Sequence, residues 1–121
     1  MSSSFARFWV AVAAASLVAA SGLFIHQGPQ DYVVTAIDYH FHDAHPTLPL
    51  GPGQDLVVKN ASENVHNVTI TATGFSQDVN PGGQLRIPDI AELLGGPGKY
   101  SFYCAYHQDR GMIGVIVIGG S

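Results

Sequence analysis

The most informative segment of this chain carries a thiol, an imidazole and a thioether within a few residues of one another. Two residues separate Cys104 from His107, and four separate His107 from Met112. These are donor types of a mononuclear copper site, in which two imidazoles and a thiolate form a trigonal set with a weak axial thioether. Such a set suits an ion that cycles between Cu(I) and Cu(II). Because this segment supplies three of the four donors, a second histidine must come from elsewhere in the chain.

His66, in the sequence Val-His-Asn-Val, is the best candidate for the second imidazole. Each candidate also has a plainer interpretation: a histidine at a strand edge for His66, a small buried hydrophobe for Cys104 and core filling for Met112. Their combined types and spacing favour metal ligation over these alternatives. The amide of Asn67, beside His66, is expected to tie the two ligand segments together, as hydrogen bonds around metal ligands commonly do.

A second group of histidines, His40, His42 and His45, lies in an acidic segment that begins at Asp38. His40 and His42 are two residues apart, so an extended backbone would place both on one side. Two imidazoles on one side can chelate Cu(II) or Zn(II). The sequence nevertheless favours a solvated segment whose histidines are incidental, with a second metal site left open as the alternative.

The elements that must position these residues are short extended runs separated by Gly- and Pro-rich turns. β-Branched and aromatic residues alternate with polar ones in several runs, which is typical of an all-β sandwich. The expected strands are 32–37, 56–59, 68–71, 84–87, 100–104 and 113–118. Residues 90–94 are expected to form a brief helix with Asp89 as its N-cap. Within 100–104, alternation places Tyr100, Phe102 and Cys104 on one face.

The N-terminal part of the chain has a different character from the rest. Residues 8–25 form an 18-residue run without a charged side chain, and Arg7 precedes it. This pattern predicts an apolar helix that is either a signal peptide or an uncleaved membrane anchor. Both alternatives divide the chain into residues 1–28 and a domain over residues 29–121, and both place that domain outside the cytoplasm, with possible membrane association through residues 8–25.

Composition restricts the partners of this domain. The chain has 121 residues, enough for one domain beyond the N-terminal segment. From residue 29 onward it has four basic and nine acidic side chains, so its net charge is −5 with neutral histidines. An acidic domain does not suit nucleic acid, which requires clustered positive charge. A single cysteine excludes an internal disulfide, and metal ligation explains its presence in an exported chain.

The motif around Cys104 is similar to a known family. Residues 98–104 (Gly-Lys-Tyr-Ser-Phe-Tyr-Cys), followed by His107, Gly111-Met112 and Gly114, resemble the C-terminal copper loop of the plastocyanin-type cupredoxins. Gly53, residues 56–60 and His66-Asn67-Val68 resemble that family's upstream ligand segment. The resemblance covers residues 51–119. It departs from the family where Ala105-Tyr106 and Val65 replace prolines, which leaves the loop less constrained by its own backbone.

The resemblance implies a Greek-key β-sandwich that carries single electrons. It implies that His66, Cys104, His107 and Met112 bind one type 1 copper ion, that redox proteins are the partners, and that the protein is not an enzyme. The sequence therefore predicts a blue copper electron-transfer protein acting outside the cytoplasm. The alternative is an extracytoplasmic carrier that delivers copper to another protein, with His40, His42 and His45 as its transfer site.

Overall fold

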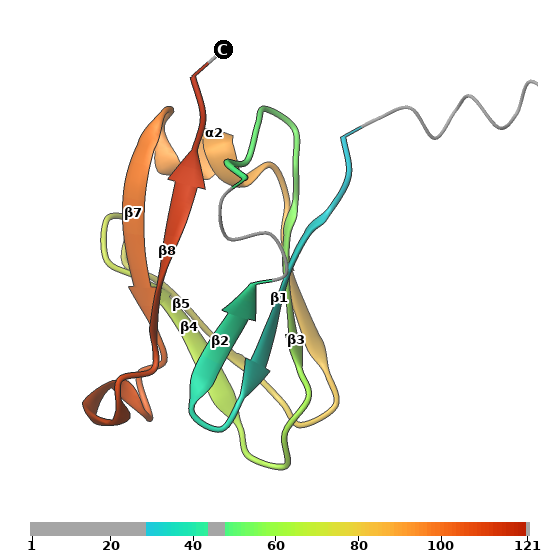
Figure 1. The fold of residues 1–121 in the computed structure, drawn as a ribbon, viewed down its shortest axis with the longest axis vertical. Helices are drawn as coiled ribbons and strands as arrows, with labels where there is room; N and C mark the ends of the chain where they lie inside the picture. The colour runs from blue at the N-terminus through green and yellow to red at the C-terminus, as the bar shows by residue number, and fades with distance from the viewer. Residues whose placement is uncertain (1–28, 44–47, 121) are drawn as a thin grey trace, which may run out of the picture.

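The computed structural model describes residues 29–43 and 48–120, which form two four-stranded sheets packed face to face (Figure 1). The first sheet has the order β2–β1–β3–β6, with β1 (Tyr32–Ile37), β2 (His40–Asp43), β3 (Leu56–Asn60) and β6 (Gln84–Ile87). The second has the order β5–β4–β7–β8, with β5 (Phe75–Val79), β4 (His66–Ile70), β7 (Gly98–Tyr103) and β8 (Ile113–Ile118). A short helix α2 (Ile90–Leu94) and a 3₁₀ turn η2 (Gln108–Arg110) complete these elements. The expected all-β sandwich is confirmed.

Strand pairing in the second sheet brings two distant segments to one end of the sandwich. β4 pairs antiparallel with β7, with Thr69 opposite Tyr103 and Ile70 opposite Phe102. Because antiparallel neighbours run in opposite directions, the start of β4 and the end of β7 lie together. The loop from β7 to β8 and the turn from β1 to β2 also lie at this end, the lower one in Figure 1, whereas α2 lies at the other end.

The core lies between the two sheets, where the inward side chains of both meet. The strand residues of this core are Val34, Ala36, Leu56, Val58, Val68, Ile70, Val79, Leu85, Ile87, Phe102, Ile116 and Ile118. The ring of Phe102 packs against Phe41, with their centroids 4.7 Å apart, and covers Gly114 of β8. A Cβ atom at Gly114 would lie 2.4 Å from that ring, so this close packing requires glycine there. The core thus fixes the strand that leads into Cys104.

Most of the expected elements are confirmed. Strands over 32–37, 84–87 and 113–118 and the helix over 90–94 have the predicted bounds, and the other predicted strands differ by one or two residues. β5 was not predicted, because its Ser-Gln-Asp centre is polar and exposed. Asp89 occupies the N-cap position, as predicted, but its side chain makes no capping hydrogen bond to the helix. It accepts instead from the Gly53 N–H at 3.0 Å, because Asp89 has a left-handed backbone conformation.

Residues 1–28 lie outside the described residues, so the N-terminal apolar helix and the boundary at residue 28 stay predictions. His45 of the second histidine group also lies outside them. Within residues 29–43 and 48–120, no helix is both long and apolar enough to cross a membrane.

Candidate metal centre

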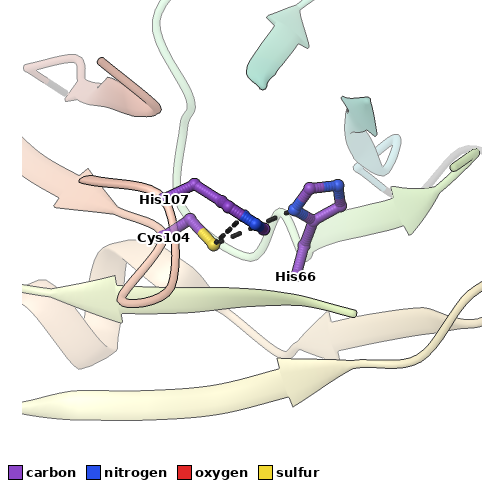
Figure 2. A group of neighbouring side chains, drawn as sticks. All are labelled: His66, Cys104 and His107. Carbon is purple, nitrogen blue, oxygen red and sulfur yellow. Dashed lines mark hydrogen bonds between the residues drawn. The ribbon is translucent and has the colours of Figure 1, made fainter. Parts of the chain in front are cut away.

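Three of the four predicted ligands meet at the end of the sandwich where β4 begins and β7 ends. The Cys104 Sγ lies 3.5 Å from the Nδ1 of His107 and 3.9 Å from the Nδ1 of His66. Figure 2 shows both imidazoles directed toward the sulfur. One donor atom from each of the three residues lies within 4.8 Å of the other two, which is close enough for a single ion to bind all three. His66 and Cys104 are fully buried, and His107 is partly exposed.

The fourth predicted ligand, Met112, is fully buried and belongs to the same loop. Backbone hydrogen bonds close this loop: the Cys104 N–H donates to the Met112 carbonyl at 3.0 Å, and the Met112 N–H donates to the His107 carbonyl at 3.3 Å. Gly111 precedes the methionine with a φ of 81°, a left-handed conformation that glycine adopts without strain. The spacing seen in the sequence thus corresponds to a closed loop that carries a thiol, an imidazole and a thioether.

Asn67 connects the two ligand segments, as the sequence predicted. Its backbone N–H points at the Cys104 Sγ at 3.3 Å, and its side-chain Oδ1 accepts the Ala105 N–H at 3.2 Å. The Nδ2 of the same side chain donates to Asp78 Oδ1 at 2.9 Å, and Asp78 Oδ2 accepts from the Tyr106 hydroxyl at 2.7 Å. These contacts tie the Cys104–His107 segment to β4 and β5. They restrain a loop that lacks the prolines of the related family.

The turn between β1 and β2 contacts both histidines, which the sequence did not predict. The Asp38 Oδ1 lies 2.9 Å from the Nε2 of His66. The ring centroids of Tyr39 and His107 lie 4.7 Å apart. The Arg110 guanidinium lies over the ring of Tyr39, 4.5 Å from its centroid. The sequence interpretation treated this region as a solvated acidic segment. The only sequence feature that could have indicated these contacts is a carboxylate next to an aromatic residue, at a turn between two extended runs.

The surroundings of His66 favour a neutral imidazole. Burial lowers the pKa of His66 from its ordinary value, the Asp38 carboxylate opposes that shift, and the nearby His107 adds to it. Metal binding requires a neutral imidazole, because a protonated ring nitrogen has no lone pair to give. Burial of His66 thus favours the neutral form that a metal needs.

His40 and His42 do not join this centre. Both are exposed on β2, and their rings lie nearly parallel with centroids 6.0 Å apart. They share one side of the strand, as predicted from their spacing. Whether they bind a metal stays a prediction.

The donor chemistry at the centre fits copper. A buried thiolate and thioether with two imidazoles combine soft and intermediate donors, which suit Cu(I) and Cu(II) better than hard oxygen-seeking cations. His66, Cys104, His107 and Met112 are a possible site for one type 1 copper ion.

A two-sheet sandwich with this donor set at one end defines the class of the cupredoxins. The family model of the cupredoxin-like domain matches residues 4–118, and the chain belongs to this family. The match confirms the resemblance seen in the motif around Cys104.

Known proteins agree with this assignment. Plastocyanin from the chloroplast of pea, Pisum sativum, is 27% identical over 124 residues, covering 90% of this chain and 67% of the pea protein. The chain spans less of two plastocyanins from Arabidopsis thaliana, 47% and 44% of their lengths. Among solved structures, oxidized plastocyanin from the fern Dryopteris crassirhizoma has a TM-score of 0.57 and 14% identity, over 72% of this chain and 99% of that one. An amicyanin variant in its reduced Cu(I) form has a TM-score of 0.55 and 18% identity, over 74% and 82%.

Proposed function

We propose that this protein is a type 1 (blue) copper electron carrier, with His66, Cys104, His107 and Met112 as the ligands. The observation that carries the proposal is the convergence of two imidazole nitrogens on the Cys104 sulfur, at 3.5 and 3.9 Å, where two antiparallel strands meet. Family membership supports it. Bound copper supplies a one-electron couple between Cu(II) and Cu(I), and the protein performs no substrate chemistry.

The protein's own residues keep the donors in place while the charge at the centre changes. His66 begins β4 and Cys104 follows β7, so the sheet restricts both. Asn67 links the two segments, and the buried Met112 closes the loop. Rigid donors leave little to rearrange between the two oxidation states, which favours rapid electron exchange. His107 is the only partly exposed ligand, so electrons enter and leave beside it.

We further propose that the domain over residues 29–121 acts outside the cytoplasm and exchanges electrons with redox partner proteins. The uncharged run over residues 8–25 behind Arg7 supports export, and a membrane anchor would keep the domain near a membrane surface. The net charge of −5 favours partners with a basic docking surface, through electrostatic steering.

The test of the function begins with the protein loaded with one equivalent of Cu(II). An intense absorption band in the red region, narrow copper hyperfine splitting in the EPR spectrum and one reversible one-electron voltammetric wave are expected. A pale protein with wide splitting would mean that imidazoles alone bind the metal, and would overturn the proposal.

Met112→Leu tests the axial ligand. Leucine has a similar volume, so the fold should tolerate it at a loss below about 1.5 kcal/mol. The red-region band should persist, because the thiolate remains. The reduction potential should rise, because Cu(II) loses a weak donor. Voltammetry of the two copper-loaded proteins makes the comparison, and an equal potential would show that Met112 does not coordinate.

A copper carrier is the second candidate, favoured by the nearly parallel rings of His40 and His42. A carrier would bind a second, labile copper equivalent at this exposed pair. Titration of the protein with Cu(II), beside a His40→Ala/His42→Ala double variant, separates the two functions. One tight equivalent in both proteins supports the electron carrier, and a labile equivalent lost only in the double variant supports the copper carrier.

A further inference from the structure

We propose that Asp38 is a positioning residue for the copper centre: its carboxylate holds the buried ligand His66 through Nε2 and lowers the reduction potential of the site. This inference rests on the proposed function. It concerns a residue from the first sheet, in the turn between β1 and β2, that acts on a ligand of the second sheet.

The geometry assigns opposite roles to the two nitrogens of His66. Its Nδ1 faces the Cys104 sulfur at 3.9 Å, and its Nε2 lies 2.9 Å from Asp38 Oδ1. A neutral imidazole carries one proton, so a ring that gives the Nδ1 lone pair to a metal must carry its proton on Nε2. A carboxylate at Nε2 accepts that proton in a hydrogen bond. Asp38 therefore selects the tautomer that the metal requires and fixes the ring plane.

Asp38 is itself held in place. Its second oxygen, Oδ2, accepts from Asn64 Nδ2 at 2.8 Å, so both carboxylate oxygens have partners on the segment before and within β4. Burial of the carboxylate opposes ionisation, but hydrogen bonds from Asn64, Ser62 and His66 outweigh it and keep the pKa of Asp38 below its ordinary value. The side chain is 34% exposed, so the carboxylate is partly shielded from water.

The charge of Asp38 distinguishes between the two oxidation states. With one thiolate ligand, the centre carries one positive charge with Cu(II) and none with Cu(I). An anion hydrogen-bonded to a ligand stabilises the charged state more than the neutral one, and it makes the imidazole a stronger donor. Both effects favour Cu(II). The surroundings of His107 differ from those of His66, because the ring of His107 packs against the ring of Tyr39, with their centroids 4.7 Å apart.

The experiment compares the copper-loaded protein with Asp38→Asn, which keeps the size of the side chain and removes its charge. The Cu(II)/Cu(I) affinity ratio should fall about tenfold, which raises the potential by about 59 mV. The red-region band should remain. Asp109→Asn is the matched control, because Asp109 lies in the ligand loop and, among the described residues, bonds to neither histidine. A rise in Asp38→Asn no larger than in Asp109→Asn would overturn the inference.

A second measurement needs no variant. In the diamagnetic Cu(I) protein, ¹H–¹⁵N NMR should find the His66 ring proton on Nε2, protected from exchange with solvent. An Nε2 proton that exchanges with solvent as freely as an exposed one would overturn the inference, whereas a proton on Nδ1 would contradict His66 as a ligand and with it the proposed function. The two failures are distinguishable, because loss of the red-region band from the unmodified protein contradicts the electron carrier, whereas a band with an unaltered potential in Asp38→Asn contradicts only the role of Asp38.

Discussion

Replacing Cys104 with serine is expected to abolish the red-region band of the copper-loaded protein and to weaken Cu(II) binding by more than about 100-fold. That loss exceeds the 10–100-fold typical of residues that only support a ligand, because the variant removes a ligand itself. The sandwich should stay folded, since serine occupies nearly the same space and the Asn67 N–H that faces the sulfur can donate to a hydroxyl. Absorption and copper titration measure the first two effects, and circular dichroism measures the third.

Ser101→Ala provides the control for Cys104→Ser, because Ser101 lies three residues earlier on the exposed face of β7. Its copper-loaded form should keep the colour and the affinity of the unmodified protein. A red-region band that survives in Cys104→Ser would show that the Cys104 thiolate is not its source, and would contradict the electron-carrier proposal.

Removing the Asn67 amide is expected to lower the free energy of unfolding of the copper-free protein by about 2–3 kcal/mol. The buried Oδ1 accepts the Ala105 N–H, and Asn67→Ala leaves that group without its acceptor, at a cost of about 1–3 kcal/mol. Asp78 also loses a donor. Urea unfolding should show a lower midpoint with an unchanged slope, as a stability change without a change in compactness requires.

Gln77→Ala is the matched control for Asn67→Ala. It removes a side-chain amide from β5, the strand that pairs with β4, but Gln77 is exposed. Its effect should stay within about 0.5 kcal/mol. An equally small effect from Asn67→Ala would contradict the role of Asn67 as the link between the ligand segments.

The sequence predicted those parts of the fold that follow from local pattern. Alternation in residues 100–104 placed Phe102 and Cys104 on the buried face, which is confirmed. β5 was missed because its central residues are polar and exposed, so its sequence carries no apolar alternation. Its pairing with β4 is a tertiary effect that local pattern does not encode.

The candidate centre likewise has a part that the local sequence predicts and a part that depends on tertiary packing. Cys104, His107 and Met112 lie within nine residues, so their spacing alone indicated a common loop. His66 was predicted from chemistry, because the donor set was short of an imidazole. Asp38 was missed because its partner lies 28 positions away and the two meet only when one sheet packs on the other. The local sequence pattern indicated only an acidic turn, and it gave no reason to expect a contact between this turn and a ligand.

The burial of Cys104, His66 and Met112 has a consequence for how the metal is acquired and lost. With His107 as the only partly exposed donor, an incoming ion must pass its imidazole, which lies against the Tyr39 ring beneath the Arg110 guanidinium. We therefore expect metal loading to require a movement of this one ring, while the three buried donors keep their positions. If electrons pass beside the same histidine, as proposed, a partner seated over it would also retain copper in the protein during the encounter.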